Sequence, residues 1–113
     1  MEKYREERPW GNFEQFCLNQ QCSVKLINVK SDSELSLQYH HKRDEFWRII
    51  VGNPIIFIDD KEIRAKAGDE FFINRETLHQ IKTKDFAAQV LEISFGEFDE
   101  KDIVRVKDRY NRD

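Results

Sequence analysis

The sequence predicts an all-β fold, and two observations carry that prediction. Short turn signals rich in Gly, Asn, Asp and Pro interrupt the chain about every eight to twelve residues. The segments between them have the length of strands and are apolar or alternate between apolar and polar residues, which is typical of a β-sandwich or barrel. No long amphipathic helical repeat occurs in the middle of the chain.

Each element follows from these turn signals and from the alternation between them. Turns are expected at residues 31–33, 52–54, 59–61 and 68–69, where Gly, Asn, Asp and Pro supply the backbone geometry that turns need. The expected strands lie at residues 13–18, 23–29, 35–40, 45–51, 54–58, 62–65, 70–73, 79–82 and 87–95. The tail at residues 97–113 is compatible with a short helix or with a strand that closes over the body.

Length and composition indicate one domain that spans residues 1–113 and has its own core. Of the 113 residues 39% are hydrophobic, including nine Phe and two Trp, while 36% are charged. The net charge of -3 and the lack of a basic block argue against nucleic acid as a partner. No apolar run of about 18 residues predicts a membrane span, and no signal region opens the chain. We expect a cytoplasmic protein.

Two cysteines, Cys17 and Cys22, are too few for a zinc ribbon, which needs a second pair. In a reducing compartment we expect them to be free thiols on or near neighbouring strands rather than a disulfide or a metal site.

A set of potential metal ligands gathers around the turn between two predicted strands. Side chains of a strand alternate between its faces, so Gln38 and His40 share one face, and Glu45 opens the next strand. His79 stands at the start of a later strand. Two imidazoles and two oxygen donors suit Zn, Fe, Mn, Ni or Co and leave positions open for substrate. The alternative is that these histidines are solvated residues of loops and strand ends.

At these residues the sequence resembles the cupin superfamily, a family of jelly-roll barrels. Its first motif reads H-x-H-x3-4-E with a Gly further on; here Gln38 takes the first His position, Gly52 follows Glu45, and His79 stands for the second motif. The stretches RPWG at 8–11, LSLQYHH at 35–41, EFW at 45–47 and GEF-x-E-x-DIVR at 96–105 are similar to the type II phosphomannose isomerase domain. The resemblance runs from about residue 8 to residue 112.

The resemblance implies a cupin double-stranded β-helix with a short C-terminal closing segment. It also implies Gln38, His40, Glu45 and His79 as ligands of a divalent ion, zinc first among the candidates. The chain departs from the family at Lys42 and Phe46, where histidines are usual, and at residues 74–78, where bulky charged residues replace a small turn. These departures put the substrate in doubt.

The implied reaction is the isomerisation of mannose 6-phosphate and fructose 6-phosphate, which needs a base and an electrophile. Arg105 and Lys25 are the candidate catalytic residues, with Arg105 on the substrate. The base stays open between Lys25 and His41, although strand parity turns His41 away from the metal.

Two alternatives to an isomerase remain. One is a cupin that binds a metal and a sugar without turnover, and the other is a different metal-dependent cupin enzyme in carbohydrate metabolism. By resemblance we also expect a homodimer. From the length we expect no guanylyltransferase in this chain, although one often accompanies this domain in the family that the sequence resembles.

The sequence also predicts where the two tryptophans lie. We expect Trp10 to pack on the barrel and Trp47 to line its interior, because Trp47 shares strand parity with Glu45.

Overall fold

The structure is a computed structural model that describes residues 3–110 and forms strands without any helix in that range. The strands are β1 Tyr4–Arg8, β2 Gly11–Gln15, β3 Cys22–Val29, β4 Leu37–Tyr39, β5 Arg43–Val51, β6 Ile55–Ile58, β7 Lys61–Arg64, β8 Glu70–Ile73, β9 His79–Lys82, β10 Ala88–Gly96 and β11 Val104–Lys107. Among these residues, then, no helix is available to cross a membrane.

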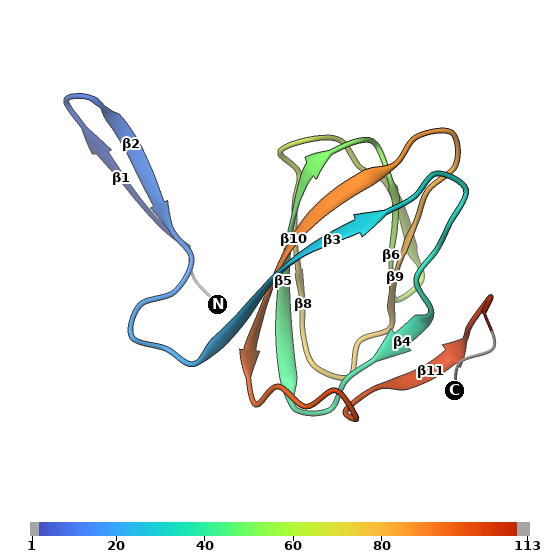
Figure 1. Ribbon diagram of the computed structural model, residues 1–113. Helices are drawn as coiled ribbons and strands as arrows, with labels where there is room; N and C mark the ends of the chain where they lie inside the picture. The colour runs from blue at the N-terminus through green and yellow to red at the C-terminus, as the bar shows by residue number, and fades with distance from the viewer. Residues whose placement is uncertain (1–2, 111–113) are drawn as a thin grey trace.

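Two antiparallel sheets face each other and form a barrel, and a hairpin stands away from it (Figure 1). One sheet has the strand order β3-β10-β5-β8 and the other has the order β11-β4-β9-β6-β7. The prediction of an all-β jelly-roll is confirmed. In the ambiguous tail, the described residues 97–110 contain the strand β11, which pairs with β4 and so closes the second sheet, as the resemblance implied; residues 111–113 lie outside the described range.

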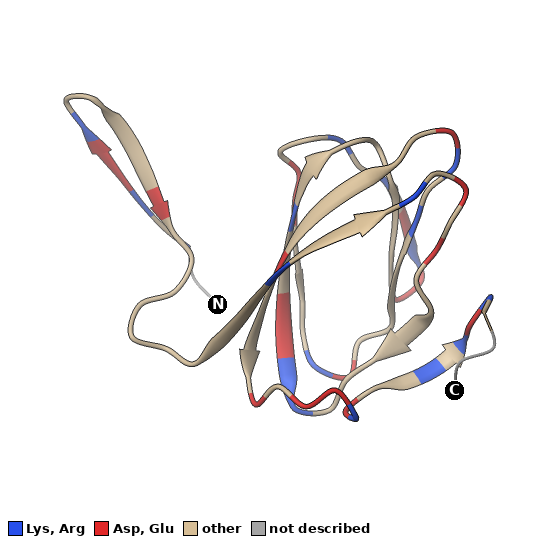
Figure 2. Cartoon of the chain, in the orientation of Figure 1, with Lys and Arg blue, Asp and Glu red and all other residues tan. Residues whose placement is uncertain are grey.

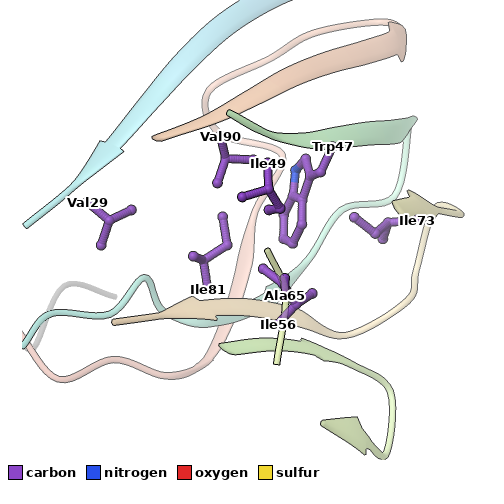
Figure 3. Packing of buried hydrophobic residues seen from close by; sticks show 8 residues of the cluster. All are labelled: Val29, Trp47, Ile49, Ile56, Ala65, Ile73, Ile81 and Val90. Carbon is purple, nitrogen blue, oxygen red and sulfur yellow. The ribbon is translucent and has the colours of Figure 1, made fainter. Parts of the chain in front are cut away.

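The core fills the space between the sheets with one face of each long strand. On β5 the side chains of Trp47 and Ile49 point inward together with Val90 of β10, because residues two apart share a face. Figure 3 shows them packed against side chains from the opposite sheet, among them Ile56 and Ile81. The expected interior position of Trp47 is confirmed, with 1% of its surface exposed.

A second apolar cluster lies on the outer face of the first sheet. Phe46, Ile93 and Phe95 are buried there because Phe16 and the two cysteines, in the segment that leads from β2 into β3, cover them. Cys17 and Cys22 are free thiols whose sulfur atoms lie 3.3 Å apart, as expected for neighbours near a strand start.

The N-terminal hairpin is the main departure from the predicted elements. Strand β1 was not anticipated, and Trp10 does not pack on the barrel: it sits in the turn between β1 and β2 with 72% of its surface exposed. Polar contacts hold the base of the hairpin, because Lys3 bridges Glu14 and Glu70. Hydrogen bonds from Lys3 and Arg48 lower the pKa of Glu14 to about 2.

Glycine substitutions test how closely the turns approach the barrel. Gly52 and Gly68 both have positive φ, +91° and +94°, but a Cβ at Gly52 would lie 2.5 Å from the Ala87 carbonyl oxygen, whereas at Gly68 nothing lies within 4 Å. We expect Gly68→Ala to cost about 1–2 kcal/mol of unfolding free energy from its backbone alone. Gly52→Ala should cost about 1–3 kcal/mol more from the clash. Urea unfolding measures both, and equal losses would contradict the close approach.

Candidate metal centre

Three buried side chains from three strand segments meet inside the barrel. His40 follows β4, Glu45 lies on the inner face of β5, and His79 opens β9. One Glu45 oxygen, Oε1, lies 3.0 Å from Nε2 of His79 and 3.5 Å from Nε2 of His40. Each residue exposes 2% of its surface or less. His79 stands more than thirty residues after Glu45 in the sequence, and the fold brings the ligand atoms of all three residues within 4.8 Å of one another.

Backbone carbonyls set the orientation of both imidazoles. Nδ1 of His79 donates to the carbonyl oxygen of Thr77 at 2.9 Å, and Nδ1 of His40 donates to that of Asp102 at 2.6 Å. Each bond fixes which nitrogen carries the proton and leaves Nε2 facing Glu45. This is the arrangement that metal-binding histidines usually have.

The electrostatics of the cluster favour a metal ligand set. Burial lowers the pKa of His40, which keeps its imidazole neutral as a ligand must be. Burial alone would raise the pKa of Glu45, but the neighbouring side chains of His79, His40 and Arg43 together lower that pKa, so the carboxylate stays ionised.

Both Glu45 oxygens and Nε2 of His79 are buried without a hydrogen-bond partner. Buried polar atoms are seldom left in that state. A divalent cation among them would satisfy all three atoms, so this donor set fits the metal that the sequence predicted.

Gln38, the fourth predicted ligand, lies beside the three. Its Nε2 is 3.3 Å from Nε2 of His40, while its Oε1 accepts a hydrogen bond from Ser36. The two ends of an amide are assigned from their surroundings, and a half-turn would bring Oε1 toward the cluster and let Nε2 donate to Ser36. The Gln38 side chain is therefore placed to offer its oxygen to a metal.

Arg43 is a charged neighbour that the sequence argument did not single out. Its guanidinium donates to Nε2 of His40 at 3.2 Å and stacks over the ring of Phe98 at 4.4 Å. A metal ion at His40 would take over that lone pair, so the guanidinium would have to exchange this hydrogen bond for another anionic or oxygen acceptor. Arg43 could have been identified from its position two residues before Glu45, because this spacing puts both side chains on the inner face of β5.

A cavity of about 200 Å³ opens next to the cluster, between the two sheets. Its polar lining includes Lys25, Gln38, Arg43, Glu92, Glu100 and Arg105. Figure 2 shows basic and acidic residues together at the start of β5 and in the segment that joins β10 to β11, and basic residues in β11.

The two predicted catalytic residues both line this cavity, Arg105 beside Gln38 in the register of β11 with β4. Lys25 is half-exposed and pairs with Glu100 at 3.6 Å. Glu92 could not be identified from the sequence, because an acidic residue inside an apolar strand belongs to no recognisable motif.

The residues in which the chain departs from the family lie outside this lining. Phe46 faces the other side of β5 in the outer cluster. Lys42 and His41 are exposed, and His41 lies 3.5 Å from Glu76 in the turn before β9. Arg75 of that turn pairs with Asp44. These substitutions therefore alter the outer surface and not the walls of the cavity.

The barrel and the cluster inside it define the chain as a cupin, a class in which a jelly-roll carries His and Glu ligands in its interior. More specifically, the chain belongs to the family described as mannose-6-phosphate isomerase C-terminal, whose profile matches residues 2–108.

Known proteins with a similar sequence or structure agree with this assignment. Over 107 residues the chain is 32% identical to the xanthan biosynthesis protein XanB of Xanthomonas campestris pv. campestris (strain B100), a match that covers 93% of this chain and 23% of that protein. It is 31% identical to mannose-1-phosphate guanylyltransferase 2 of Escherichia coli O157:H7, a match that covers 94% of this chain and 22% of that protein. The chain thus spans less than a quarter of these relatives.

Among solved structures, a sugar phosphate isomerase of the cupin superfamily from Silicibacter pomeroyi matches with a TM-score of 0.62 and 25% identity, covering 71% of this chain and 53% of that one.

Substitution of the clustered ligands tests the metal centre. We expect purified protein to hold about one divalent ion per chain. Glu45→Gln and His40→Ala should each weaken binding by more than the roughly 10–100-fold that loss of an outer-shell partner costs. His41→Ala, which removes the adjacent but exposed imidazole, should leave the metal content unchanged. Elemental analysis and metal titration measure this, and equal losses for all three variants would refute the assignment.

Asp102 offers a test of how His40 is oriented. Its carboxylate accepts hydrogen bonds from the backbone N–H groups of His41 and Lys42, which fixes the carbonyl that holds His40. Burial alone would raise the pKa of Asp102, but these two hydrogen bonds lower it.

Asp102→Asn keeps only one acceptor oxygen, so we expect metal affinity to fall by about 10–100-fold. Asp99→Asn in the same segment, where the carboxylate is exposed and caps Lys101, should have no effect on affinity. The same metal titration compares the two variants.

Proposed function

We propose that this chain is a metal-dependent isomerase that interconverts an aldose phosphate and a ketose phosphate, of the mannose 6-phosphate type. One observation carries the proposal. A buried His–Glu–His cluster with unpartnered ligand atoms adjoins a cavity whose polar walls include Lys25, Arg43 and Arg105. Membership of the family described as mannose-6-phosphate isomerase C-terminal supports the choice of sugar phosphate.

The reaction moves a proton between C2 and C1 of the open-chain sugar, so negative charge develops on the oxygen of the neighbouring carbon. A divalent ion held by Gln38, His40, Glu45 and His79 supplies positive charge for that oxygen when it is bound. Arg105 adds a second positive group on the same wall, since β11 pairs its backbone directly with that of Gln38. A guanidinium stays charged throughout and suits an oxyanion or a phosphate.

The phosphate needs a local positive field that the acidic net charge does not provide. Lys25 and Arg43 supply it in the lining of the cavity, where both cations lie against the ring of Phe98. Lys25 is a phosphate ligand in this proposal and not the base, because its half-exposed ammonium pairs with Glu100.

Two alternatives differ from this proposal in turnover or in substrate. A cupin that binds metal and sugar without turnover would suit a domain whose sequence relatives are several times longer and include a guanylyltransferase. Another metal-dependent cupin enzyme would use the same ligands on a different substrate. The walls of the cavity favour the isomerase, because the departures from the family lie outside them. Zinc as the metal, a homodimer and a cytoplasmic location stay predictions.

A coupled assay tests the isomerase directly. The metal-loaded chain should convert mannose 6-phosphate to fructose 6-phosphate with a turnover number in the range of about 1–10³ s⁻¹ usual for enzymes. A chelator should abolish the conversion and re-addition of metal should restore it. His79→Ala should be inactive, with His41→Ala as the matched control that stays active. Metal binding without any turnover would refute the isomerase and favour the binding alternative.

A further inference from the structure

Glu92 is a buried carboxylate inside the barrel that takes no part in the metal cluster. It lies on the inner face of β10, two residues from the core residue Val90, and exposes 8% of its surface. It lines the same cavity as Gln38 and Arg105, which belong to the opposite sheet. Removing a carboxylate from water is costly, so its place in an apolar strand calls for a role.

The neighbours of Glu92 hold the carboxylate without neutralising it. Its backbone lies opposite Trp47 of β5 and Lys25 of β3. Nε1 of Trp47 donates to Oε1 of Glu92 at 3.5 Å, a contact with a neutral donor. Lys25 pairs with Glu100 instead, and within residues 3–110 no basic group lies within ion-pairing distance of Glu92. The carboxylate thus keeps an oxygen for a ligand in the cavity.

The other groups in the cavity do not suit the transfer of a proton. Arg43 and Arg105 carry guanidinium groups, which do not serve as proton acceptors in proteins. The side chain of Glu100 is 81% exposed and bound to Lys25. Among the described residues that line the cavity, this leaves Glu92 as the enclosed group able to accept and return a proton.

The sheet also sets a suitable distance between Glu92 and the metal cluster. Glu92 lies opposite Trp47, and Glu45 is two residues before Trp47 on the same face of β5. Diagonal neighbours of this kind are about 7–8 Å apart. A substrate unit of two carbons and their oxygens fits between side chains at that spacing, with one oxygen at the cluster and the C2 hydrogen toward Glu92.

We propose that Glu92 is the general base of the isomerisation, an inference that rests on the proposed function. Glu92 takes the hydrogen of C2 as a proton, the C–H electron pair forms the C1–C2 double bond, and the C1 carbonyl pair moves onto O1. The acid form of Glu92 then returns the proton to C1 while the proton of the C2 hydroxyl passes to O1 and C2 becomes the carbonyl. Every atom and electron is retained, and no further reactant is needed.

Glu92→Gln tests this role, because the amide has the same shape and its oxygen still accepts the hydrogen bond of Trp47. In the metal-loaded chain we expect the turnover number for mannose 6-phosphate to fall by about 10²–10⁴-fold. Metal content and the dissociation constant for the sugar phosphate should stay within about threefold of the original, a margin of less than 1 kcal/mol. Exchange of the C2 hydrogen with deuterium from D₂O, followed by NMR, should be lost in parallel.

Two further variants separate a base from a structural residue. Glu97→Gln removes an exposed carboxylate outside the cavity, one that pairs with Lys42, and should leave turnover within about threefold. Glu92→Asp keeps a shortened carboxylate and should recover part of the activity and of the deuterium exchange. Thermal unfolding of each variant checks that the barrel is folded. If Glu92→Gln does not fold, Glu92→Asp serves as the test in its place.

The outcomes distinguish this inference from the proposed function. An active original chain with an equally active, folded Glu92→Gln variant overturns the role of Glu92 and leaves the isomerase standing. An original chain with neither turnover nor exchange, although it binds metal, overturns the isomerase and the role of Glu92 with it. Loss of turnover together with loss of metal or sugar phosphate binding would also overturn the role as a base.

Discussion

The rest of the site depends on the burial of the Glu45 carboxylate between two imidazoles that are each fixed from behind. Taking a carboxylate out of water costs several kcal/mol, and the protein offsets this with the neighbouring side chains of His79, His40 and Arg43. The carbonyls of Thr77 and Asp102 prevent the imidazoles from turning away. A divalent cation would complete this arrangement by binding the Glu45 oxygens and Nε2 of His79 directly.

Beside the metal cluster, the cavity also gathers charged groups where they can contact a substrate. The cluster lies at one end of the inner face of β5 and the apolar core at the other, with Trp47 between them in edge contact with His79. The three cations and two carboxylates of the lining come from both sheets and from the segment before β11. Groups of both signs therefore face one small space, which suits a reaction that needs a phosphate ligand, an oxyanion partner and a base.

Much of the fold and part of the site could be predicted from the sequence. The strands from residue 22 to residue 96 follow from alternation and turn residues, which are local properties. The hairpin tip was predicted wrongly, because nothing local tells whether Trp10 meets the barrel or solvent. Glu92 and Arg43 were missed, because the meaning of a charged residue in a strand depends on which face it occupies and what lies across the barrel.

The sequence by itself determined that the chain forms strands, that Gln38 and His40 share a face, and that Glu45 begins the strand after them. These are consequences of spacing along one chain. Only the tertiary structure decided that His79, more than thirty residues later, meets Glu45 at 3.0 Å. It also decided that the carbonyl of Asp102 orients His40 and that Glu92 faces the same cavity. Such contacts depend on how strands far apart in the chain pair and which sheet faces they turn inward.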